Sequence, residues 1–109
     1  MTKQATELLK GTLDGIVLAS LSDRPAYGYE ITARLREQGF SDIAEGTVYA
    51  LLVRMEKRGL VDVEKVVSEK GPPRKVHSLN AQGREYLEEF WTTWSFLVER
   101  LKQLREGVG

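Results

Sequence analysis

The sequence predicts a single α+β domain that is mostly helical and ends in one long helix. Three observations favour this fold class. In four separate segments, apolar residues recur every three or four positions, which is the period of an α-helix. Residues 60–79 instead alternate with a period of two, which is typical of β-strands. The chain has 109 residues, of which 41% are hydrophobic, and this is the size of one ordinary globular domain.

The first half of the chain predicts three helices. The first runs from Ala5 to Leu21 and ends at a loop that contains Pro25. The second is short and runs from Tyr27 to Gln38, where Gly39 stops it. Residues 40–44 form a brief linker that could contain a single strand step. The third helix runs from residue 46 to the Arg58-Gly59 pair at residues 58–59.

The second half predicts a hairpin and a long final helix. Residues 60–67 and 74–79 have the alternating character of two strands, and the turn between them contains Gly71 and two prolines. Asn80 is a good helix cap, and no proline or helix-stopping glycine follows it before Gly107. A helix of about 26 residues, on the order of 40 Å long, is therefore expected.

Three helices, a hairpin and a further helix form the order of a winged helix-turn-helix domain, in which the third helix enters the DNA major groove. We expect residues 1–79 to form this DNA-binding domain and residues 80–109 a dimerisation helix. Lys70, Arg74 and Lys75 lie in the loop segment of the hairpin with no acid between them, although such a run can also be a solvated turn. Alternatives also remain open on the third helix, where Thr47 could be a helix cap and Tyr49 a packed ring. The candidate DNA-binding residues are Thr47, Tyr49, Arg54, Lys57, Lys70, Arg74 and Lys75.

The final helix has the sharpest apolar pattern, with spacings of three and four that form a heptad seam. Tyr86, Trp91 and Val98 widen this stripe beyond what so small a domain could cover. The pattern therefore predicts a homodimer, with the first helix also packing at its interface. Two-fold symmetry would place the recognition helices about 34 Å apart, which suits an inverted-repeat operator. The candidate interface residues are Leu9, Leu13, Leu87, Phe90, Trp94, Leu97, Leu101 and Leu104.

Composition and motifs exclude other classes of protein. Sixteen basic and sixteen acidic residues balance, so a nucleic-acid role depends on where the charges lie. The absence of cysteine fits a cytoplasmic protein. No apolar stretch approaches the roughly 20 residues that a membrane span needs, so no membrane partner is expected. His77, the single histidine, is interpreted as a strand residue. Without a phosphate loop, nucleophile elbow or metal-ligand cluster, we expect no enzyme and no cofactor.

Six further segments are informative together: residues 8–13, 27–31, 45–52, 55–60, 71–75 and 79–83. Their residues, order and spacing resemble those of the PadR-like transcriptional regulators, in particular the compact subgroup with a single long C-terminal helix. The resemblance implies a dimeric, cytoplasmic, prokaryotic repressor that binds a palindromic operator and releases it when a ligand or another signal arrives. The sequence departs from the family pattern at Ala50, where proline is common, at His77-Ser78, where an aromatic pair is usual, and at Asn80, where threonine often caps the helix.

The resemblance also bears on the two tryptophans. Compact family members include proteins whose interface tryptophans stack against flat aromatic drugs, which makes Trp94, with Trp91, a candidate site for such an effector. An aromatic stripe at helical spacing can equally be core. For the whole chain, the alternative to a DNA-binding repressor is a winged-helix module that binds protein and not DNA.

Overall fold

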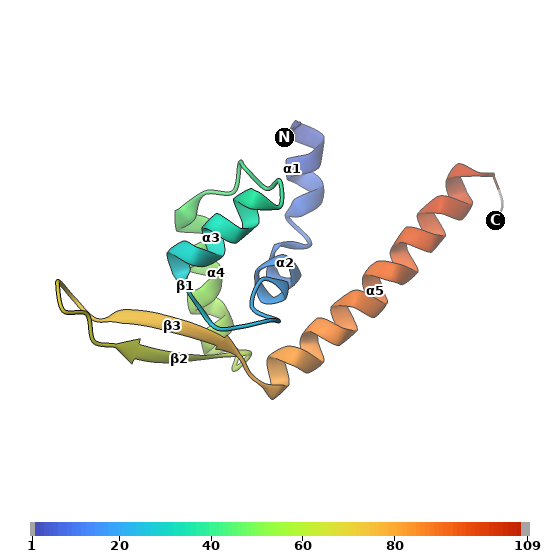
Figure 1. Cartoon of the computed structure of the whole chain (residues 1–109). Coiled ribbons are helices and arrows are strands. Elements are labelled where there is room, and N and C mark those ends of the chain that lie inside the picture. The colour runs from blue at the N-terminus through green and yellow to red at the C-terminus, as the bar shows by residue number, and fades with distance from the viewer. Residues whose placement is uncertain (1, 108–109) are drawn as a thin grey trace.

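The computed structural model describes residues 2–107, which form five helices and a three-stranded sheet (Figure 1). The order of elements confirms the predicted winged helix-turn-helix with a long C-terminal helix. The expected domain limits 1–79 and 80–109 include residues 1, 108 and 109, which lie outside the described residues. The elements are α1 (Lys3–Leu9), α2 (Leu13–Ala19), β1 (Ala26–Tyr27), α3 (Gly28–Glu37), α4 (Glu45–Lys57), β2 (Val61–Val66), β3 (Arg74–Leu79) and α5 (Ala81–Arg105).

The predicted continuous first helix is wrong, because the chain breaks between α1 and α2. At the break, the carbonyl oxygen of Leu9 accepts hydrogen bonds from both the N–H (2.9 Å) and the hydroxyl (3.1 Å) of Thr12. Gly11, within the break, has the lowest helix preference of any residue except proline. A second helix then begins at Leu13 with its own direction (Figure 1).

The prediction of a short strand in residues 40–44 is also wrong. The third strand of the sheet is β1. Ile43 is buried, but its segment turns, with the Ile43 N–H donating to the Phe40 carbonyl at 3.4 Å. Extended residues after Pro25 pair with β3 in antiparallel fashion, Ala26 opposite His77. The sheet order is β1-β3-β2, and β2 and β3 form the predicted hairpin, here called the wing.

The core lies where α2, α3 and α4 meet the base of the wing. Its largest fully buried side chains are apolar residues from these helices and from the loop after α2, and they fix α4 against the rest of the domain. Seven of them are less than 2% exposed: Leu18, Leu21, Ile31, Leu52, Met55, Val17 and Val48.

The long helix α5 confirms the predicted terminal helix and leaves the domain at the base of the wing (Figure 1). Asn80 caps it as predicted, because its side-chain oxygen accepts the Gly83 N–H at 2.8 Å. The beginning of α5 packs on α2 and β3, and the rest extends away from the domain. Among residues 2–107, no helix combines the length and the apolar character that a membrane crossing requires.

Candidate nucleic-acid interface

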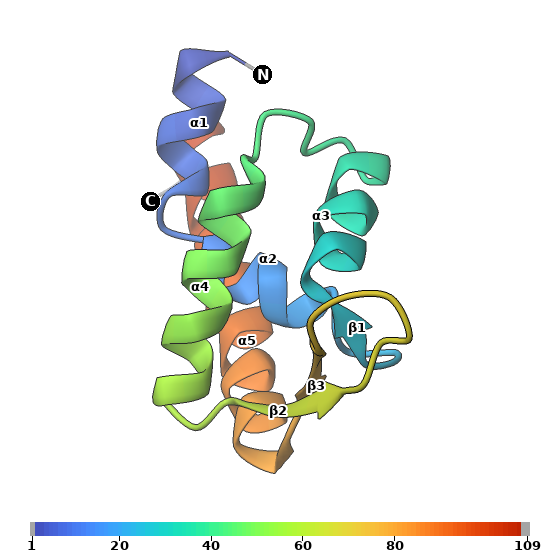
Figure 2. The same ribbon diagram turned by 90° about the vertical axis from the view of Figure 1, so that its left-hand side faces the viewer.

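Helix α4 and the wing lie on the same side of the molecule, with α5 behind them (Figure 2). Val48, Leu51, Leu52 and Met55 form the buried face of α4. Because an α-helix has 3.6 residues per turn, the opposite face is defined by Gly46, Ala50, Val53 and Lys57, and all four are exposed. We call these four residues the outward stripe of α4.

Thr47 and Tyr49 lie on opposite flanks of this stripe, and both are exposed. Ala44 is the N-cap of α4, so Thr47 is not the cap but stands in the first turn, and its hydroxyl is free of that role. The Tyr49 ring packs over Gly28, where a Cβ atom would lie 2.2 Å from Tyr49 Cε1. Its hydroxyl donates to the Glu45 carboxylate at 3.1 Å. Burial of the ring, this hydrogen bond and the negative charge of Glu45 all raise the pKa of Tyr49.

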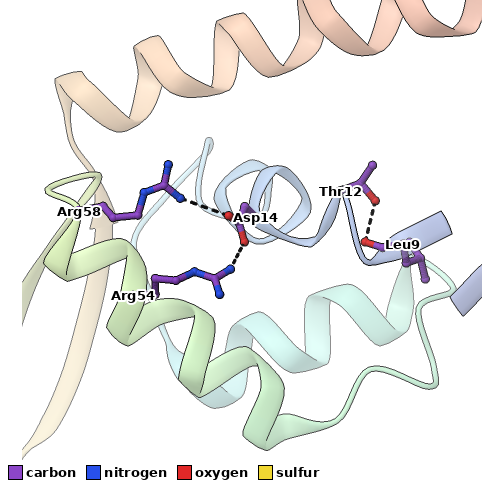
Figure 3. Close-up of polar contacts among 5 residues, drawn as sticks. All are labelled: Leu9, Thr12, Asp14, Arg54 and Arg58. Atoms are coloured by element: carbon purple, nitrogen blue, oxygen red, sulfur yellow. Dashed lines mark hydrogen bonds and ion pairs between the residues drawn. The ribbon is translucent and has the colours of Figure 1, made fainter. Parts of the chain in front are cut away.

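Arg54, which was predicted to project toward DNA, is instead paired with Asp14 of α2 (Figure 3). Its Nη2 atom donates to Asp14 Oδ1. Arg58 Nη1 donates to the other carboxylate oxygen at 3.2 Å. Arg58 also lies over the Tyr86 ring of α5, with its guanidinium carbon 5.1 Å from the ring centroid. Both arginines are therefore engaged on the α2 side of α4.

The wing carries the cations that the sequence predicts, together with one that it missed. Lys75 lies directly opposite Lys65 in the β2–β3 register, so the two side chains share one face of the hairpin. By strand alternation this is the face of His77 and Leu79, which turn toward the core. Like charges directly opposite each other are unfavourable without an anion nearby. Lys65 therefore joins the candidate residues, and the register is the signal that identifies it. Lys70 is exposed in the turn between the two strands.

Two tyrosines hold Arg74 at the edge of the wing. The Tyr27 and Tyr29 rings stack with centroids 5.7 Å apart, and the Arg74 guanidinium carbon lies 5.9 and 5.7 Å from their respective centroids. Cation–π contacts of this kind favour one position of an otherwise flexible cation. Sequence reasoning missed both tyrosines because they precede Arg74 by more than forty residues.

A groove of about 810 Å³ separates the wing from α4. Tyr49 and Val53 line its α4 side, and Arg74 and Lys75 line its wing side. The floor includes His77, which is 7% exposed. The groove therefore presents two cations, the Glu56 carboxylate and several aromatic edges between the two elements that a winged helix places on DNA.

His77 confirms its interpretation as a strand residue. Its Nδ1 atom is buried and has no hydrogen-bond partner within residues 2–107. Burial lowers the pKa of His77, and Lys75 adds to this shift, while the Ala26 backbone and Glu56 act against it. No group of three metal-ligating side chains occurs in the described part of the chain.

The candidate dimer residues divide into two groups. Leu87 is buried in its own domain, and Phe90 and Leu13 are partly buried against the same core. Phe90 packs so closely on α2 that a Cβ atom at Gly15 would lie 2.3 Å from its ring. Leu9 of α1 is half-buried. The remaining candidates are 45–69% exposed: Trp94, Leu97, Leu101 and Leu104. Trp91 and Val98, which widen the stripe, and the unpredicted Phe96 are 43–58% exposed.

The two tryptophans are equally exposed, at 45% each, but their surroundings differ. The Trp91 ring meets Phe90 edge-on, with centroids 5.2 Å apart. Trp91 also borders a groove of about 580 Å³ that Ile16 and Phe40 help to line. Trp94 lies about one turn further along α5.

These features define a winged helix-turn-helix protein with cations on the wing and a long helix that carries an exposed apolar stripe. Residues 17–89 match the sequence model of the transcriptional regulator PadR-like family, and the chain belongs to that family of transcriptional regulators. This finding confirms the resemblance and accords with the expectation that the chain is not an enzyme.

Solved structures of the family share the fold over most of the chain. A PadR-like transcriptional regulator from Bacillus cereus is 37% identical, with 90% of this chain and 95% of that chain covered and a TM-score of 0.78. A PadR family regulator from Eggerthella lenta is 33% identical, with 94% and 89% covered and a TM-score of 0.86. Bacillus subtilis PadR, solved in complex with operator DNA, is 18% identical, with 72% and 46% covered and a TM-score of 0.66, and shares the fold.

Proposed function

We propose that this regulator binds an inverted-repeat DNA operator as a homodimer and represses transcription in a prokaryotic cytoplasm until a small-molecule ligand or another signal releases it. The observation that carries the DNA-binding part is the cationic groove between the wing and α4. Family membership and the DNA complex of a protein with the same fold support the same assignment. The proposed contacts are Thr47, Tyr49, Lys57, Lys65, Lys70, Arg74 and Lys75.

The wing supplies contacts to the phosphates, which position the protein without reading sequence. Arg74 is the best placed of these cations, because Tyr27 and Tyr29 already fix its guanidinium. A cation that is held before binding loses less conformational freedom on contact. The outward stripe of α4 faces the bases, where Val53 and Ala50 offer apolar contact to thymine methyl groups.

A second copy of the chain is the partner proposed for α5. The exposed apolar residues of its second half repeat at heptad spacing, and they lie on the part of the helix that leaves the domain. Such a surface is larger than a monomer of this size normally exposes. Leu87 and Phe90 are proposed to anchor α5 to its own domain, while Trp94, Leu97, Leu101 and Leu104 meet the second copy.

The effector site is proposed at the same interface. Two-fold symmetry brings equivalent residues of the two α5 helices together, so the Trp94 rings of the two copies could enclose a flat aromatic molecule. Trp91, beside its groove with α2 and α3, would form the outer wall of this site.

The DNA-binding proposal is tested with labelled duplex DNA from the region flanking the gene, measured over a series of salt concentrations. The wild-type protein should bind with strong salt dependence, whereas a module that binds only protein should ignore the duplex. Arg74→Ala should weaken binding to every sequence and lower the salt slope by about one per protomer. Lys102→Ala is the matched control, because it removes the same charge from the far end of α5 (Figure 1). An unchanged slope for Arg74→Ala would remove this residue from the interface.

A further inference from the structure

Asp14 draws Arg54 of α4 and Arg58, the C-cap of α4, toward α2 and away from the outward stripe. Its two carboxylate oxygens are divided between them, Oδ1 accepting from Arg54 and Oδ2 from Arg58 (Figure 3). The Asp14 side chain is 24% exposed, compared with 55% for Arg54 and 43% for Arg58. The carboxylate is thus the more buried centre of the cluster, and the arginines are its more exposed partners.

The consequence is a recognition helix with little positive charge where it faces DNA. Gly46, Ala50 and Val53 are small or apolar, and Lys57 is the one cation of the outward stripe. Non-specific affinity for DNA depends on cations that replace condensed counterions at the phosphates. An arginine that is held by a carboxylate must first break that pair before it can make such a contact.

The packing of α2 fixes the position of Asp14. The double hydrogen bond from Thr12 to the Leu9 carbonyl ends α1 and allows α2 to begin at residue 13, with Asp14 in its first turn (Figure 3). The next residue, Gly15, packs on the ring of Phe90, so α2 cannot shift toward α5. The backbone at Asp14 is therefore held by contacts that do not involve the arginines.

The two arginines differ in how firmly they are held. Arg58 has a second partner in the Tyr86 ring of α5. Arg54 stands one turn closer to the exposed N-terminal half of α4, on the same flank as Thr47. Loss of the carboxylate should therefore release Arg54 more completely than Arg58.

We propose that Asp14 is a positioning residue that holds Arg54 and Arg58 away from DNA phosphates and so lowers sequence-independent binding. The inference rests on the proposed DNA-binding function. It adds a residue, Asp14, that regulates the charge of the same DNA-binding surface. Specific binding then relies on the fit of the outward stripe and on the cations of the wing, because α4 itself adds little charge. Discrimination between operator and other DNA is the property that Asp14 protects.

The test measures binding to a labelled duplex of mixed sequence, about 30 base pairs or three helical turns long, over a salt series. Asp14→Asn keeps the shape of the side chain but not its charge. We expect tighter binding at low salt and a salt slope that is steeper by about one per protomer. Between about 50 and 200 mM salt, the variant should therefore lose affinity roughly threefold to fourfold more than the wild type does for each added contact. Asp14→Glu, which retains the charge, should restore the wild-type slope.

Two controls separate this mechanism from a general change of charge. Glu106→Gln removes one negative charge from the far end of α5, away from α4 and the wing, and should leave the slope unchanged. Arg54→Gln alone should also leave the slope unchanged, because a sequestered arginine makes no phosphate contact. In the Arg54→Gln background, most of the effect of Asp14→Asn should disappear.

The outcomes distinguish the inference from the proposed function. A slope for Asp14→Asn equal to that of the wild type would overturn the inference alone, as would an effect of full size in a protein that lacks both arginines. A lower slope for Arg54→Gln would show that Arg54 contacts DNA despite Asp14. This result alone would overturn the inference, without the Asp14 variant. Failure of the wild type and of every variant to bind any duplex at low salt would overturn the proposed function and the inference together.

Discussion

Replacement of Gly83 by alanine is expected to destabilise the domain, although alanine normally favours a helix. Gly83 lies in the first turn of α5, at the base of the wing. A Cβ atom there would lie 2.1 Å from the carbonyl oxygen of Leu60 and 2.6 Å from Leu79 Cδ1. The side chain of Leu79 can rotate, but the backbone oxygen of Leu60 cannot move without shifting the start of β2. Gly83 is therefore what allows α5 to cross the wing at this distance.

The expected magnitude follows from two opposing terms. Alanine in place of glycine within a helix stabilises by about 1 kcal/mol. Forcing an extra carbon into a packed contact costs about 1 to 3 kcal/mol, and contact with backbone places this case near the upper end. The net loss of unfolding free energy is about 1 to 2 kcal/mol, which lowers the melting temperature of a domain of this size by about 4 to 8 °C.

Thermal unfolding followed by circular dichroism measures this change, and Gly46→Ala provides the matched control. Gly46 is also in the first turn of a helix, but a Cβ atom there would have no neighbour within 4 Å. The control should melt at or above the wild-type temperature, because alanine raises the unfolding free energy by at most about 1 kcal/mol there. If Gly83→Ala behaves like Gly46→Ala, the close crossing of α5 and the wing is wrong.

Three further predictions concern pH, assembly and the effector. Because burial lowers the pKa of His77 in the folded state, the unfolded chain binds more protons below its ordinary pKa of 6.5, and stability should fall as the pH drops from about 7.5 to 5.5. His77→Leu should flatten that part of the pH profile in chemical denaturation. Leu97→Asp should convert the proposed dimer to monomers or aggregates in sedimentation, and a wild type that is monomeric at micromolar concentration would contradict the dimer. Planar aromatic dyes should quench tryptophan fluorescence in Trp91→Phe but not in Trp94→Phe, and a panel of dyes that quenches neither the wild type nor Trp91→Phe would leave Trp94 as packing surface only.

Local patterns were sufficient to predict most of the fold. The 3.6-residue period located α3, α4 and α5, and the change to a period of two located the wing. The same method failed at the break between α1 and α2, because Leu9, Leu13 and Ile16 keep helical spacing across it. Gly11 was the available signal, and the hydrogen bonds of Thr12 explain why the chain turns there.

The site was predicted less completely than the fold, because several of its side chains are placed by partners far along the chain. Arg54 has the spacing of an exposed residue, but Asp14, forty residues earlier, sets its direction. Arg74 was predicted from its basic neighbours, but Tyr27 and Tyr29 fix its guanidinium. A periodic pattern identifies the face of an element on which a residue lies. It carries no information about which distant group will hold that residue.

Helix α2 connects α5 to α4, so it is the route by which the proposed effector site would reach the proposed DNA-binding surface. Two adjacent residues of α2 contact different helices, since Gly15 packs on Phe90 of α5 and Asp14 binds the arginines of α4. A ligand at α5 can alter DNA affinity only if it binds two arrangements of the protein unequally. An arrangement in which α2 followed α5 and moved away from α4 would separate Asp14 from Arg54, and α4 would gain charge toward DNA. Closure of the same contact would restore the pair, so a ligand at α5 that holds α2 against α4 is expected to weaken sequence-independent binding.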